Sequence, residues 1–83
     1  MKNIEESKII SRQLREKAHQ SKQYKDIIRE LGNTDIQKIT NDVILLCLTY
    51  EIDCETLIEC SADYKENKIT EEELKNIIYA VLN

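Results

Sequence analysis

The scarcity of helix-breaking residues constrains the fold of this chain more than any other feature. Its 83 residues include one glycine, Gly32, and no proline, the two residue types that most disfavour a helix interior. Apolar side chains recur at the three- and four-residue spacings of a helix in at least three segments. The sequence therefore predicts an all-helical protein. It has no linker, repeat or low-complexity tract that would divide residues 1–83 into more than one domain.

Periodicity and capping residues together predict a four-helix arrangement with a long first helix. The predicted helices span residues 4–31, 35–51, 54–65 and 71–82. Gly32 is suited to the position just after the first helix, and Thr70 with Glu73 forms a capping box before the last. Residues 43–48 in the second helix are apolar on all sides, so we expect that helix to be central and the most buried.

The first helix is too long for so small a body if it is continuous. Residues 4–31 would span about 42 Å as a helix, whereas a compact domain of this length has a diameter of about 30 Å. Its apolar side chains lie at the two ends, and between residues 15 and 23 only Ala18 is apolar. Three arrangements follow. The N-terminal residues Ile9, Ile10 and Leu14 pack on a second copy in a homodimer, which is our leading expectation, or the helix kinks near Ser21, or its N-terminal end frays.

Charge is unevenly distributed along the chain. Residues 1–31 contain eight Lys/Arg and five Asp/Glu, a net charge of +3, whereas residues 32–83 contain four and eleven, a net charge of −7. A basic segment joined to an acidic body either neutralises it or leaves both parts free to bind partners. We therefore look for function on the surface of the protein.

The third predicted helix carries the most regular charge pattern. Its acidic residues recur at spacings of four, four and three and so stack along one face, opposite Leu57 and Ile58. They are Glu55, Glu59, Asp63 and Glu66. Carboxylates at these spacings repel one another by a few tenths of a kcal/mol per pair, which a basic partner would relieve. The pattern predicts a binding face for a larger protein with a basic surface. The alternative is a solvated face balanced by the chain's own first helix.

The first helix gives only a weak nucleic-acid signal. Its Lys and Arg residues are interleaved with Asp and Glu, and the whole chain has a net charge of −4. No recognition-helix motif or array of stacking aromatic residues accompanies them. Binding to DNA or RNA is therefore a minor alternative.

The sequence contains no convincing catalytic, cofactor or metal-binding motif. His19 is the single histidine, and Cys47, Cys54 and Cys60 have spacings that match neither a zinc knuckle nor a redox pair. We expect these thiols to be reduced, as is usual in the cytoplasm. Residues 62–73 match only the second half of a calcium-binding loop, so no calcium site is predicted. No apolar run is long enough to span a membrane.

These observations favour a small, acidic cytoplasmic protein that acts by occupying a surface of a larger protein. It would serve as an inhibitor, as an antitoxin-like or immunity-type factor, or as an adaptor, and not as an enzyme. The alternative is an architectural helical subunit that self-associates through its first helix, or, less strongly indicated, a nucleic-acid-binding regulator. The abundance of Ile, Lys and Asn indicates an AT-rich genome, such as that of a bacterium or phage.

Overall fold

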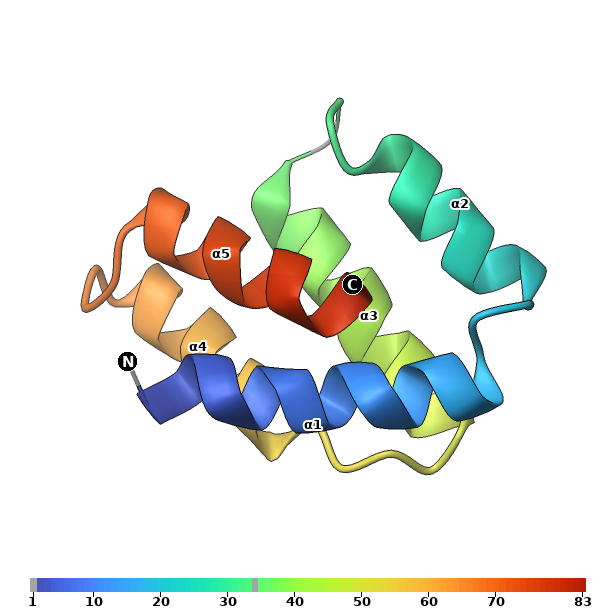
Figure 1. The fold of residues 1–83 in the computed structure, drawn as a ribbon. Coiled ribbons are helices and arrows are strands. Elements are labelled where there is room, and N and C mark those ends of the chain that lie inside the picture. The colour runs from blue at the N-terminus through green and yellow to red at the C-terminus, as the bar shows by residue number, and fades with distance from the viewer. Residues whose placement is uncertain (1, 34) are drawn as a thin grey trace.

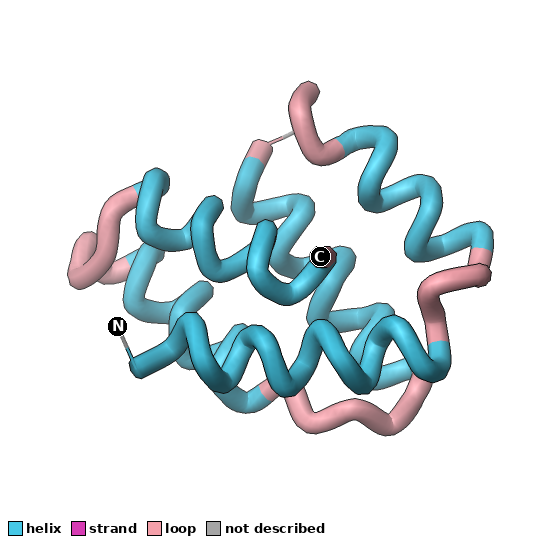
Figure 2. The backbone as a smooth tube through the Cα atoms, in the orientation of Figure 1, coloured by secondary structure: helices cyan, strands magenta, loops and turns pink. Residues whose placement is uncertain are grey.

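The computed structural model describes residues 2–33 and 35–83, which form five helices joined by short loops (Figure 1). The helices are α1 (Lys2–Lys17), α2 (Lys22–Glu30), α3 (Ile36–Thr49), α4 (Glu55–Lys65) and α5 (Glu71–Leu82). There is no strand in these two described ranges (Figure 2). The predicted all-helical class is confirmed, but the predicted four-helix arrangement is wrong because the first helix is divided in two.

The division between α1 and α2 lies at the kink considered near Ser21. The backbone of Ser21 is extended, with φ −72° and ψ 152°, and its side chain accepts a hydrogen bond from Tyr24 N–H. It therefore acts as an N-cap, which satisfies one of the free N–H groups at the start of a new helix. Tyr24 is buried, and its hydroxyl group donates to the carbonyl oxygen of Leu82 at the end of α5. This tertiary contact draws α2 back over the body.

Because α1 ends at Lys17, it does not project from the molecule. Its 16 residues correspond to about 24 Å of helix, and the whole structure measures 33 × 26 × 18 Å. α1 lies alongside α5 (Figure 1), where Ile10 and Leu14 are 4% and 0% exposed. The expectation that these two side chains lie beyond the body is therefore wrong. Of the three predicted self-association residues, Ile9 alone is on the surface, at 55% exposed. The homodimer was expected because these residues would lack a partner within the chain, and that reason no longer holds.

α3 was expected to be the central and most buried helix, but it buries only one side. Its buried residues are Ile36, Ile39, Thr40, Val43, Leu46 and Cys47. The apolar run had suggested burial on all sides, but Leu45 is 64% exposed and Leu48 is 58% exposed. The other helices of so short a chain cover α3 incompletely. Two large apolar side chains therefore remain on the surface of the protein's most apolar helix.

Local capping interactions determine where the helices begin and end. The capping box of Thr70 and Glu73 at the start of α5 is present as predicted. α3 and α4 are each followed by a residue in the left-handed conformation, Glu51 with φ 57° and Asn67 with φ 62°. In both places the next N–H bonds back to a carbonyl five residues earlier, as from Ile52 to Cys47 at 2.8 Å. This is the Schellman arrangement, which usually places glycine at that position.

Candidate functional site

The predicted acidic residues lie on the outward side of α4. The helix packs inward through Leu57, Cys60 and Ser61. Glu55, Glu59 and Glu66 are therefore exposed, and Asp63 is partly buried. Ile58, which was expected opposite the carboxylates, is instead 49% exposed. We call the surface formed by Glu55, Ile58, Glu59, Asp63 and Glu66 the α4 face.

Among the described side chains, one carboxylate of the α4 face has an ion-pair partner. Glu66 forms an ion pair with Lys68 at 3.0 Å, and both side chains are largely exposed. Glu55, Glu59 and Asp63 have no ion pair with any residue whose side chain is described. α1 contributes an acidic group beside α4, because Thr56 Oγ1 donates a hydrogen bond to the Glu6 carboxylate.

Three basic side chains of α1 lie elsewhere, beside the C-terminal end of α5. Lys8, Arg12 and Arg15 line a shallow hollow there together with Asn83. Arg15 donates to the backbone carbonyl of Asn83 and, at 3.3 Å, to Ser11 Oγ. The free carbonyl groups at a helix C-terminus carry partial negative charge and so attract cations. None of the described basic side chains of α1 forms an ion pair with a carboxylate of the α4 face.

A groove between α2 and α3 forms a second surface feature, which sequence reasoning missed. It has a volume of about 280 Å³, and its apolar lining comes from Ile27, Leu45 and Leu46. The charged residues around it are Asp26, Glu30, Lys38 and Asp42, and Gln23 and Thr49 complete the lining. Leu45 lies within an apolar run, and only the structure shows that its side chain is exposed and lines this groove.

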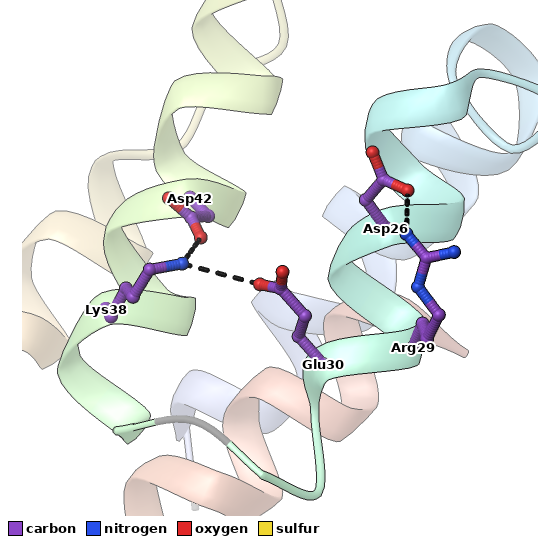
Figure 3. Close-up of polar contacts among 5 residues, drawn as sticks. All are labelled: Asp26, Arg29, Glu30, Lys38 and Asp42. Carbon is purple, nitrogen blue, oxygen red and sulfur yellow. Dashed lines mark hydrogen bonds and ion pairs between the residues drawn. The ribbon is translucent and has the colours of Figure 1, made fainter.

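One ion pair, between Lys38 and Glu30, connects the two helices that form the groove. Figure 3 shows Lys38 of α3 reaching toward Glu30 of α2. Lys38 Nζ lies 3.4 Å from a carboxylate oxygen of Glu30 and 3.0 Å from one of Asp42. These contacts, that to Asp42 foremost, raise the pKa of Lys38 above its ordinary value. Arg29 pairs with Asp26 along α2. The ammonium group of Lys38 is therefore a cation of the chain itself that already lies among the carboxylates of the groove.

The three cysteines are buried and unpaired. Burial raises the pKa of Cys47 to about 12 and that of Cys60 to about 11, with nearby carboxylates contributing to the second shift. Burial also raises the pKa of Cys54. Since the thiolate is the reactive form of cysteine, these groups are poor nucleophiles at neutral pH.

Within the described parts of the chain, no cluster of three or more His, Cys, Asp or Glu side chains is placed to hold a metal ion. The same residues contain no helix with the length and apolar character needed to cross a membrane. Comparison with protein-family models, with curated proteins and with solved structures finds no match to this chain.

Proposed function

We propose that this protein acts by binding a basic surface of a larger protein through the α4 face, as an inhibitor, an antitoxin-like or immunity-type factor, or an adaptor. The observation that carries the proposal is that Glu55, Glu59 and Asp63 of the α4 face form no ion pair with any described side chain. Like charges held together at helical spacing are slightly unfavourable for the isolated protein. A basic partner converts that repulsion into attraction.

The apolar component of the α4 face supports the same proposal. Ile58 borders the carboxylates and is half exposed. On α3, Leu48 lies three turns from Gln37, whose side chain donates to Ser61 of α4 at 2.6 Å, so Leu48 lies on the side of α3 that faces α4. Protein interfaces commonly combine apolar side chains that become buried with a charged rim. The carboxylates would steer a basic partner during the encounter, and the apolar side chains would be desolvated in the complex.

The chemistry of the thiols supports a binding role in the cytoplasm. The three cysteines are free, and free cysteines are typical of a reducing compartment. Their raised pKa values argue against nucleophilic catalysis. We therefore propose a cytoplasmic protein that acts by association.

The test is affinity capture from the source cells with three baits compared quantitatively. The first bait is the wild-type protein, and the second carries Glu59→Lys and Asp63→Lys on the α4 face. The third is a control with the same change in charge, Glu16→Lys and Glu72→Lys, at exposed positions on α1 and α5. We expect the wild type and the control to capture the same larger protein and the α4 variant to lose it. Capture should also weaken as salt is raised.

Stability measurements on the same variants separate the two readings of the α4 face. If the face is free for a partner, the double reversal leaves helicity and the thermal midpoint nearly unchanged. Equal capture by all three baits would contradict the proposal. A large fall in the thermal midpoint of the α4 variant would show that the carboxylates have partners within the chain.

A further inference from the structure

The groove between α2 and α3 has the size of a site for protein side chains. Its volume of about 280 Å³ lies just below the range of about 300–1,000 Å³ that is usual for small-molecule pockets. Its apolar lining is short and open, with Leu46 buried and Leu45 largely exposed beside it. Such a groove can receive a few apolar side chains from a segment that lies across it.

The charge of the groove identifies the kind of segment that fits. Asp26, Glu30 and Asp42 line it with three carboxylates, and Lys38 supplies one ammonium group, which gives a net charge of −2 (three negative, one positive). Arg29 pairs with Asp26 but is not part of the lining, and its side chain is 73% exposed. Exposed pairs of this kind are weak and exchange partners easily. The occupant should therefore be basic.

The length of the groove sets the size of the segment. Its lining on α3 extends from Lys38 to Thr49, a distance along the helix of about 16 Å, or three helical turns. A helix of that length can place apolar side chains three or four residues apart along the groove while its flanks carry lysine or arginine.

We propose that the α2–α3 groove binds a basic amphipathic helix of about three turns, with its apolar side chains against Leu45 and Leu46 and its cationic side chains among Asp26, Glu30 and Asp42. This surface is distinct from the α4 face. It can bind a second segment of the same partner or a different protein.

The test uses two designed peptides of about twelve residues with leucine at identical helical positions. One peptide has lysine at the remaining positions and the other has glutamate. Each is titrated into the ¹⁵N-labelled protein, and amide chemical shifts are followed by NMR spectroscopy. We expect the Leu/Lys peptide to shift amides of α2 and α3 in a saturable manner, and the Leu/Glu peptide to leave them unchanged. Equal binding of the two peptides, or no saturable shift in α2 and α3, would overturn the proposal.

Variants of the groove make the test specific. Leu45→Gln should weaken binding of the Leu/Lys peptide, whereas the matched control Ile58→Gln on α4 should not, and both positions are exposed enough for the variants to fold. Lys38→Gln makes the groove more negative and should tighten binding by about twofold, while Asp42→Asn should weaken it to a similar extent. Weaker binding by the Lys38 variant would contradict a cationic occupant.

Two further outcomes separate this proposal from its alternatives. In the Glu59→Lys/Asp63→Lys background, binding in the groove should persist, so the groove can be confirmed even if the α4 face fails. Conversely, chemical-shift changes confined to α4 would show that the peptide binds only to the α4 face, and would refute the proposed binding site in the groove. Concentration-dependent shifts of groove amides without any peptide would indicate that a second copy of the chain is the occupant, and would also overturn the proposal.

Discussion

Leu14→Ala offers a direct test of the assignment of α1 to the protein's own core. Leu14 is fully buried, and truncation of a buried leucine costs about 2–5 kcal/mol. A domain of this length has a total stability of about 4–12 kcal/mol. A loss near the middle of the range, about 3 kcal/mol, would lower the thermal midpoint by about 12–24 °C. Ile9→Ala is the matched control, because Ile9 lies on the same helix but is largely exposed. Its cost should stay below about 1 kcal/mol, since alanine's higher helix propensity offsets part of the lost burial.

The assay is urea unfolding followed by far-ultraviolet circular dichroism at two protein concentrations about tenfold apart. If Leu14 is buried within one chain, the loss of stability is the same at both concentrations. If Leu14 were buried between two chains, unfolding would depend on concentration because dissociation accompanies it. A small effect of Leu14→Ala together with a larger effect of Ile9→Ala would refute the placement of α1. So would a midpoint that rises with concentration in the wild type and not in the Leu14 variant.

The remaining predictions concern local features of the fold. Ser21→Ala removes the N-cap of α2 and should lower the free energy of unfolding in urea by about 1 kcal/mol. Glu51→Gly should raise that free energy by about 1 kcal/mol, because glycine adopts the left-handed conformation without strain. An unchanged free energy of unfolding in either variant would contradict the corresponding assignment. Cys47 and Cys60 should react slowly with a thiol reagent in the native protein and rapidly in denaturant, because burial raises their pKa values to about 12 and about 11. Prompt reaction in native buffer would contradict their burial. The same shifts make stability fall as pH rises above about 9, where these thiols ionise only in the unfolded chain, by about 1.4 kcal/mol per pH unit for each thiol. The contribution of Cys60 to this loss of stability should end near pH 11. Cys47→Ala should reduce the slope of the free energy of unfolding against pH, measured by urea unfolding. An unchanged slope would show that Cys47 is not its cause.

Local signals in the sequence predict much of the fold because they act over a few residues. Asp35 was expected near the start of the second helix, and its carboxylate accepts a hydrogen bond from Gln37 N–H at 2.7 Å. The capping box at Thr70 is likewise contained within four residues. Such interactions depend little on the rest of the molecule, so the sequence suffices to place them.

The division of the first helix depends on contacts that are remote in sequence. Residues 15–23 contain neither glycine nor proline, so local propensity favours a continuous helix. The bend depends on contacts such as the hydrogen bond from Tyr24 to Leu82, 58 residues away. Ser21 could be identified as a potential N-cap, but its use depends on that tertiary packing. For this reason the kink was one of several alternatives at the level of sequence.

The surface was predictable in part. Helical spacing places Glu55 and Glu59 on one face, and the structure agrees that both are exposed. The exposure of Leu45 follows instead from how much of α3 the other helices can cover. An apolar run contains no information about which of its side chains will lack neighbours. The α2–α3 groove was therefore missed.

The central claim, that the α4 face contacts a larger protein, is tested most directly by amide hydrogen exchange. The captured partner would be purified, and exchange of this chain would be compared with and without it. We predict that the partner slows exchange most strongly in α4, in both halves of the helix, whether or not α2 and α3 are also protected. Protection confined to α1 and α5, with exchange in α4 unchanged, would contradict the account.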